Sequence, residues 1–191
     1  MKLPQTKSMA TESGENLPPG YPAGLEGWYT AGNGRQVFLR PVKPTDRRLL
    51  VGLFHRLSDR SIRLRFLGLL RELDPHLLDH FTLVNYVSDF AIVATLVERG
   101  EDHIIAVSRY HRDDDTGGTE FGVAVRDDWQ GMGVGKEMVR RLFEAARKNG
   151  IRRVEAAIDF SNEAIPRLLN TLGYSYTWKP LRGTYSLQVE L

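Results

Sequence analysis

The feature that most constrains the fold is a strand that ends in a glycine-rich loop and leads into a long helix. The expected strand covers residues 120–126, and Gly131, Gly133 and Gly135 alternate just before the apolar helical pattern of 133–149. Glycines allow backbone conformations and close approaches that a side chain blocks. Unpaired N–H groups and a partial positive charge gather at a helix N-terminus. The segment therefore predicts a cradle for a phosphate or pyrophosphate group.

The rest of the chain alternates between strand-like and helix-like periodicity. Expected strands cover about 37–39, 90–97, 104–110, 120–126, 154–158, 174–179 and 184–189. Expected helices cover about 44–57, 62–70, 75–85, 133–149 and 163–172. This order predicts an α/β fold with a mixed sheet of about seven strands and helices on both faces.

The length of 191 residues predicts one domain with a tail. Residues 1–27 are rich in Pro, Gly, Glu, Ser and Thr, a composition that buries too little apolar surface to offset the entropy of ordering. We therefore expect a flexible N-terminal tail over 1–27 and a single domain over 28–191.

Composition excludes several classes of function. The chain has no cysteine, so disulfides, thiolate zinc sites and a cysteine nucleophile are absent. Its net charge of +2 does not indicate nucleic acid or a membrane surface as a partner. No run of about 18 apolar residues occurs, and the N-terminus lacks the apolar stretch of a signal peptide. We expect a cytoplasmic protein and leave its oligomeric state open.

Two familiar phosphate-binding motifs do not match the glycine-rich loop. The dinucleotide fingerprint G-x-G-x-x-G fails because the third residue after Gly133 is Lys136. The P-loop needs four residues between its first glycine and a Gly-Lys pair, followed by Ser or Thr. Here Lys136 is followed by Glu137, so the P-loop also fails.

The pattern Q-x-x-G-x-G, at Gln130, Gly133 and Gly135, resembles the acetyl-coenzyme A (acetyl-CoA) signature of the GNAT superfamily of N-acetyltransferases. The order of elements over about residues 35–190 is also similar to that fold. The resemblance implies a GNAT-like mixed sheet, acetyl-CoA as cofactor and transfer of an acetyl group to an amine. The alternative is a glycine turn that only starts the helix.

The resemblance also implies which residues hold the cofactor. The pyrophosphate would bind the amides of the loop, and the pantetheine arm would pair with the preceding strand as an added strand does. Asn162 would contact the pantetheine or orient its strand, and a helix-capping role is an equal alternative. The implied cofactor-binding residues are Val123, Ala124, Val125, Gln130, Gly131, Met132, Gly133, Val134, Gly135, Lys136 and Asn162.

Glu120 is the candidate catalytic residue. Attack on a thioester needs a neutral amine, yet a free lysine amine has a pKa of about 10.4, so a general base is useful. Strand alternation places Glu120, Gly122 and Ala124 on one face, which leaves room for a thioester beside a carboxylate. The alternative is an exposed charge at a strand end.

Residues 119–131 resemble the motif of bacterial GNAT protein-lysine acetyltransferases, in which a glutamate at the place of Glu120 serves as base. Leu57-Ser58, Ser61 and Arg65-Phe66 agree with that subgroup. The resemblance implies a protein substrate, such as an acyl-CoA synthetase, which would be acetylated on a lysine. A small-molecule acceptor (a polyamine or an amino acid) and a non-catalytic sensor of acyl-CoA are the alternatives.

Two further positions limit the chemistry. Many members of the superfamily carry a tyrosine general acid where this chain has Leu169, and we expect Tyr174 and Tyr176 to pack rather than to replace it. His76 and His80 have the spacing of helical metal ligands, but they lack the glutamate of H-E-x-x-H and an evident third ligand. We therefore expect no metal site.

Overall fold

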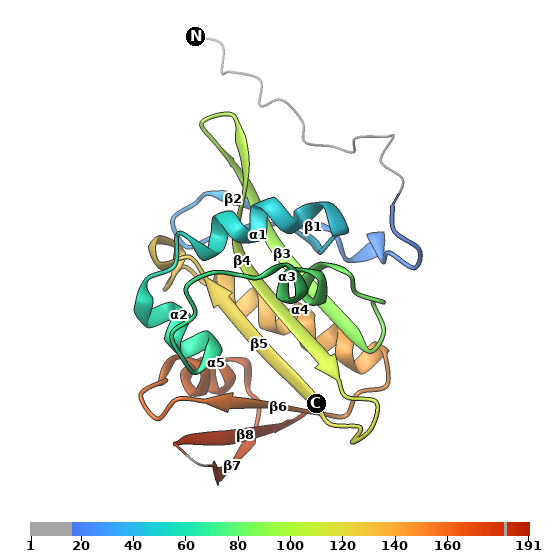
Figure 1. Cartoon of the computed structure of the whole chain (residues 1–191), viewed down its shortest axis with the longest axis vertical. Coiled ribbons are helices and arrows are strands. Elements are labelled where there is room, and N and C mark those ends of the chain that lie inside the picture. The colour runs from blue at the N-terminus through green and yellow to red at the C-terminus, as the bar shows by residue number, and fades with distance from the viewer. Residues whose placement is uncertain (1–16, 182) are drawn as a thin grey trace.

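The computed structural model describes residues 17–181 and 183–191 and contains one eight-stranded sheet with α-helices on both faces (Figure 1). The strands are β1 Gly27–Thr30, β2 Gln36–Pro41, β3 Asp89–Glu98, β4 Glu101–Arg112, β5 Thr119–Val125, β6 Arg153–Ile158, β7 Tyr176–Leu181 and β8 Thr184–Glu190. The α-helices are α1 Arg47–Phe54, α2 Asp59–Phe66, α3 Pro75–Thr82, α4 Val134–Lys148 and α5 Ala164–Leu172. Short 3-10 helices η1 Ala23–Leu25, η2 Pro44–Asp46 and η3 Asp127–Trp129 join them.

The sheet has the order β1-β2-β3-β4-β5-β6-β8-β7, and its neighbours are antiparallel except β5 and β6. The predicted mixed α/β sheet with helices on both faces is confirmed. The eighth strand, β1, was not expected, because four residues are too few to show a period-two pattern.

Helix boundaries follow the capping residues. Asp74 accepts a hydrogen bond from the amide of Leu77 at 2.9 Å, and Pro75 occupies the first turn of α3. Gly150 has a φ of 78° after α4, and Gly173 has a φ of 77° after α5. The ends expected for these two helices, at about residues 149 and 172, agree with the structure to within one residue.

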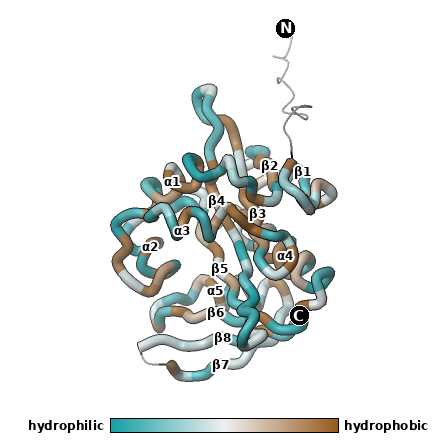
Figure 2. Tube along the Cα trace, turned by 45° about the vertical axis from the view of Figure 1, so that its right-hand side comes forward, coloured by the Kyte–Doolittle hydropathy of each residue, from teal (hydrophilic) through white to brown (hydrophobic). Residues whose placement is uncertain are grey.

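The central strands separate two packed faces. Phe90, Ile92 and Tyr110 pack on the α4 side, whereas Ala91 and Val93 pack toward α1 and α3. Figure 2 shows the apolar segments gathered where β3, β4 and α4 meet, with a hydrophilic β3–β4 hairpin tip. This alternation gives β5 one face toward α4 and one toward the three N-terminal helices.

Part of the segment predicted as a tail contacts the domain. The ring of Tyr21 packs edge-on against Tyr86 with centroids 5.6 Å apart, and its hydroxyl donates to Glu26 at 2.6 Å. Residues 1–16 of the predicted tail lie outside the described residues. The division at residue 27 stays a prediction.

Candidate functional site

The glycine-rich loop joins β5 to α4 through η3. Gly131 and Gly133 have φ values of 73° and 81°, in the left-handed region that favours glycine. Gly133 is the N-terminal cap residue of α4, which begins at Val134. The predicted strand–loop–helix arrangement is therefore confirmed, and the backbone conformation favours glycine at both turning points.

The backbone amides of this loop form the cradle itself. Among the described residues, no acceptor pairs with the amides of residues 131–136, and the first intrahelical bond runs from Glu137 N to Gly133 O at 3.1 Å. Consecutive free N–H groups at a helix N-terminus attract anions, because their partial charges add to the helix dipole. The loop is thus chemically suited to a pyrophosphate.

Residues of the β1–β2 segment support the loop from outside. Gly32 N donates to Met132 O at 2.9 Å, and Asn33 Nδ2 lies 3.0 Å from the sulfur of Met132. A Cβ at Gly133 would lie 2.5 Å from the hydroxyl of Tyr29, so no side chain fits there unless the Tyr29 side chain moves. Tyr29 and Asn33 were missed, because β1 and the turn that follows it were not expected.

Strand β5 has an open backbone edge beside the loop. β5 and β6 are paired only at Glu120 and Glu155, and Figure 1 shows them diverging from that end. Arg126 N donates to Ile105 O of β4, so by alternation the peptide groups of Val123 and Val125 point to the open side. Gln130 Nε2 already donates to Val125 O there, at 3.0 Å.

Glu120 lies where β5 and β6 meet, and its side chain is exposed. Phe121 packs on Phe143 of α4, and Gly122 lies under Arg65 of α2. Because alternate residues of a strand share a face, Glu120 points to the same side as Gly122. The predicted alternation is confirmed, and the face that carries Glu120 is the one covered by the N-terminal helices.

Arg65 is the unexpected residue on that face. A Cβ at Gly122 would lie 2.8 Å from its Cζ, and the guanidinium lies 5.1 Å from the ring centroid of Phe66. Burial and the charge of Arg109 lower the pKa of Arg65 to about 10, and Glu120 opposes this shift. No described residue accepts a hydrogen bond from Arg65, and most of the side chains around it are apolar.

Arg65 lines an apolar pocket between the three N-terminal helices and strands β4 and β5. Its lining is mostly leucine and phenylalanine, with two arginines: Leu50, Leu53, Phe54, Leu57, Arg65, Phe66, Leu73, Phe81, Val107, Arg109 and Ala124. A ligand in this pocket would therefore meet apolar walls and a guanidinium with unfilled hydrogen-bonding capacity.

Asp127 connects this face to the glycine-rich loop. It accepts hydrogen bonds from the hydroxyls of Ser58 and Ser61 at 2.7 and 2.8 Å, and from Ser58 N at 2.9 Å. Burial raises the pKa of Asp127, but these hydrogen bonds outweigh it and the pKa is lowered. Ser58 also caps α2, so the helix that carries Arg65 is fixed to the start of the loop.

Behind the loop, Glu98 and Arg126 form a partly buried ion pair. Nη2 and Nη1 of Arg126 donate to Glu98, at 2.8 and 2.9 Å. Nε of the same guanidinium pairs with Asp128 at 2.6 Å. Hydrogen bonding from Arg126, assisted by Arg56 and Arg35, lowers the pKa of Glu98 to about 2 against the effect of burial. The pair fixes the end of β5 where the loop begins.

Four other positions considered in the sequence have structural roles. Asn162 Oδ1 accepts from Ile165 N at 3.4 Å, as a helix cap would. Leu169 is fully buried. Tyr174 packs on Phe143 and Tyr176 on Trp178.

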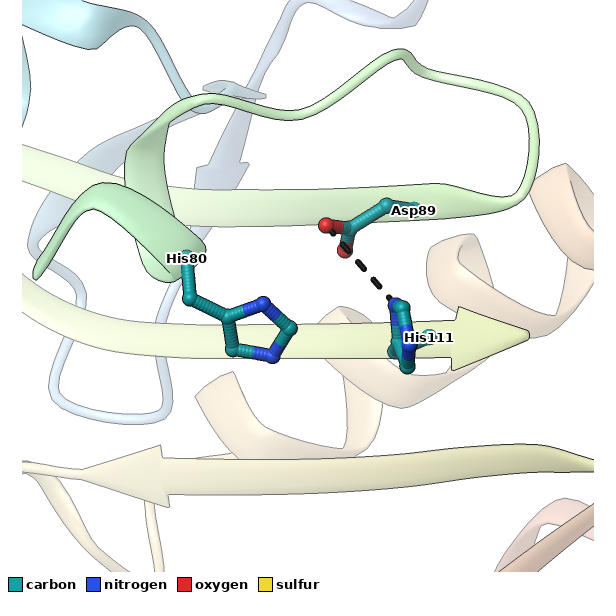
Figure 3. Close-up of side chains that lie close together, drawn as sticks. All are labelled: His80, Asp89 and His111. Atoms are coloured by element: carbon teal, nitrogen blue, oxygen red, sulfur yellow. Dashed lines mark ion pairs between the residues drawn. The ribbon is translucent and has the colours of Figure 1, made fainter. Parts of the chain in front are cut away.

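A group of possible metal ligands lies near Glu120. His80, Asp89 and His111 come together from α3, β3 and β4 (Figure 3). No third ligand for His76 and His80 was evident in the sequence, because spacing along the chain does not show how strands pair. His76, which lies four residues before His80 on the same helix, is exposed and lies outside this cluster.

Comparison with protein families gives a match over residues 64–174 to the model described as the acetyltransferase (GNAT) family. An acetyltransferase of Pseudomonas aeruginosa is 34% identical over 142 residues, which cover 74% of this chain and 76% of that protein. The acetyltransferase Pat of Mycolicibacterium smegmatis is 30% identical over 73% of this chain, but the match spans only 41% of that longer protein.

Solved structures agree with these relatives. The GNAT domain of S. lividans PAT superposes with a TM-score of 0.80 at 26% identity, covering 90% of this chain and 99% of that one. A putative acetyltransferase of Salmonella typhimurium, solved with its cofactor acetyl-CoA, has a TM-score of 0.62 at 19% identity, covering 81% and 92%. In the described part of the chain, no helix is long and apolar enough to cross a membrane.

Proposed function

This chain belongs to the acetyltransferase (GNAT) family, whose cofactor is acetyl-CoA, and from that premise we propose that it acetylates lysine side chains of a protein. Resemblance to the protein-lysine acetyltransferases, through Ser58, Ser61, Arg65 and Phe66, supports this acceptor. Further support comes from the contacts of Ser58 and Ser61 with Asp127 and of Arg65 with Gly122, next to the proposed site. An acyl-CoA synthetase is the proposed kind of protein substrate.

The proposed cofactor position follows the free backbone groups. The pyrophosphate binds the amides of residues 131–136, and the pantetheine arm runs along the open edge of β5, where it pairs with Val123 and Val125. The arm leads from the loop toward the point at which β5 and β6 meet. The thioester would then lie close to Glu120.

The observation that carries the mechanism is the position of Glu120 at the closed end of the gap between β5 and β6. In the proposed step, the Glu120 carboxylate removes a proton from the acceptor ammonium, directly or through water. The neutral nitrogen attacks the thioester carbonyl, the new C–N bond forms and the C–S bond breaks, and the nitrogen releases its second proton to solvent. The electron pair of the C–S bond leaves with the coenzyme A sulfur, which takes a proton from solvent, because Leu169 offers none.

The test is acetyl transfer by Glu120→Gln. This variant keeps the size of the side chain but cannot accept the proton, so kcat/KM should fall by about 10² to 10³-fold. Calorimetric titration with acetyl-CoA should give the wild-type affinity, because the cradle is made of backbone amides. Glu101→Gln, which changes an exposed glutamate in the β3–β4 hairpin, is the matched control and should keep wild-type activity.

Either of two results would reject this mechanism. Glu120→Gln with wild-type kcat/KM would show that Glu120 is not the base. Wild-type protein that binds acetyl-CoA yet transfers to no amine would favour the sensor.

A second candidate function, acetylation of a free amino acid, is favoured by Arg65. Its guanidinium is half-buried in the apolar pocket and has no hydrogen-bond acceptor among the described residues. A carboxylate matches the planar donors of an arginine and would remove the cost of leaving them unpaired. A free amino acid carries such a carboxylate, whereas a lysine within a protein does not.

Arg65→Lys separates the two acceptors. Lysine keeps the charge but loses the bidentate geometry, so an amino-acid acceptor should show a KM raised about tenfold. Transfer to a protein lysine should change by less than about threefold, because this acceptor offers Arg65 no carboxylate to bind. The comparison uses a lysine-containing peptide with blocked termini against free apolar amino acids.

A further inference from the structure

Three metal-ligating side chains meet on the face of the sheet that carries Glu120. His80 comes from α3, Asp89 from the start of β3 and His111 from the end of β4 (Figure 3). Each offers one ligand atom, and these atoms lie within 4.8 Å of one another. The group is thus assembled by the fold from segments that are separate in sequence.

The ligand set and its spacing suit a transition-metal ion. His111 Nδ1 lies 3.9 Å from Asp89 Oδ2, beyond hydrogen-bond distance, and the two imidazole centroids are 5.1 Å apart. In the tetrahedral geometry of zinc, bonds of about 2.1 Å to nitrogen or oxygen hold the ligand atoms about 3.4 Å apart. The side chains need to close by up to about 1.4 Å, and His80 and His111 are exposed enough to rotate.

Arg109 has two opposite effects on this group. It donates a hydrogen bond to Asp89 Oδ1 at 2.8 Å, which fixes the carboxylate and leaves Oδ2 on the side of His111. Outer hydrogen bonds of this kind orient metal ligands. The positive charge of Arg109 opposes a cation, so the affinity should be lower than that of a closed four-ligand site.

We propose that His80, Asp89 and His111 bind a divalent transition-metal ion such as Zn²⁺. Two imidazoles and one carboxylate are an established ligand set for this ion, with water completing the coordination. Asp89, His111 and Glu120 are direct register partners across β3, β4 and β5, so the ion lies one strand away from Glu120. The effect on activity rests on the proposed role of Glu120: the positive charge of the bound ion opposes the approach of the acceptor ammonium and so reduces acetyl transfer.

The test is calorimetric titration of chelator-treated, tag-free protein with Zn²⁺, with Co²⁺ absorption as a second probe of coordination. Wild-type protein should bind one equivalent. His80→Ala and His111→Ala should each weaken binding at least tenfold. His76→Ala is the matched control, because it removes an exposed histidine from the same helix outside the cluster, and it should bind as wild type does. Near-ultraviolet circular dichroism checks that each variant is folded.

The proposal is overturned if wild-type protein does not bind Zn²⁺, or if His76→Ala weakens binding as much as His80→Ala does. The titration needs no acetyl transfer, so it is independent of the proposed function. In the transfer assay, Zn²⁺ should reduce the rate of wild type but not of His80→Ala. Acetyl-CoA affinity should be equal with and without the ion.

Discussion

The two sides of the site are built in different ways. The proposed cofactor loop, residues 130–136, is one contiguous segment that offers backbone amides. The proposed acceptor face, which is the side of the sheet that carries Glu120, is assembled from side chains of α2, α3, β3, β4 and β5. Backbone donors depend on local conformation, which glycine permits at Gly131 and Gly133. Side-chain positions depend on how distant elements pack. Cofactor binding should therefore tolerate changes on the acceptor face. Acceptor binding should tolerate changes in the loop less well.

The largest expected effect comes from a charge placed in the loop. A side chain at Gly131 would point into open space, and Asp and Asn both tolerate its φ of +73° better than most residues. In Gly131→Asp, a carboxylate about 6 Å from the pyrophosphate costs about 3 kcal/mol, which weakens acetyl-CoA binding roughly 100-fold. Gly131→Asn, with the same shape and no charge, should lose less than about tenfold. Equal losses in the two titrations would place the anion elsewhere.

An intermediate effect should come from the acceptor face. In Gly122→Ala, the new Cβ would lie 2.8 Å from Cζ of Arg65, so the guanidinium must move. The added methyl group also takes space that Gly122 leaves for the thioester beside Glu120, so we expect kcat/KM to fall about tenfold, or roughly 1.4 kcal/mol of transition-state stabilisation, with unchanged acetyl-CoA affinity. Gly52→Ala in α1 meets nothing within 4 Å and is the control. A matching loss of cofactor affinity in Gly122→Ala would break the distinction between the two sides.

The smallest effect concerns the ion pair behind the loop and appears as stability. The pKa of Glu98 is about 2 in the fold against 4.5 ordinarily, so its stabilisation is present above pH 4.5 and lost as pH falls toward 2. Glu98→Gln should therefore reduce the free energy of unfolding by roughly 2 kcal/mol at pH 7 and by much less at pH 2.5. Urea unfolding at both pH values measures this. An equal loss at both would show that the charge of Glu98 is not what stabilises the loop.

The sequence was sufficient to predict the loop, α4 and the face of β5 that carries Glu120. Each depends on spacing within one segment, such as the glycines from 131 to 135. The support from Tyr29 could not be predicted, because β1 has only four residues and too few positions for a periodic pattern.

Contacts between distant elements were also out of reach. The position of Arg65 over Gly122 depends on α2, which Asp127 holds through Ser58 and Ser61. The meeting of Asp89 with His111 depends on the register of β3 and β4, and that register shifts at Ala94/Thr95. Neither the tertiary hydrogen bonds nor the irregular register has a signal in residue spacing.

Asp127 has a thermodynamic consequence for an enzyme with two substrates. It lies at the start of the loop and holds the N-terminus of α2, so one carboxylate touches both binding regions. Through these hydrogen bonds, any movement of the loop on cofactor binding would be passed to the helix that carries Arg65. Coupling of this kind is reciprocal in free energy. The factor by which bound acetyl-CoA changes the affinity for the acceptor therefore equals the factor by which bound acceptor changes the affinity for acetyl-CoA.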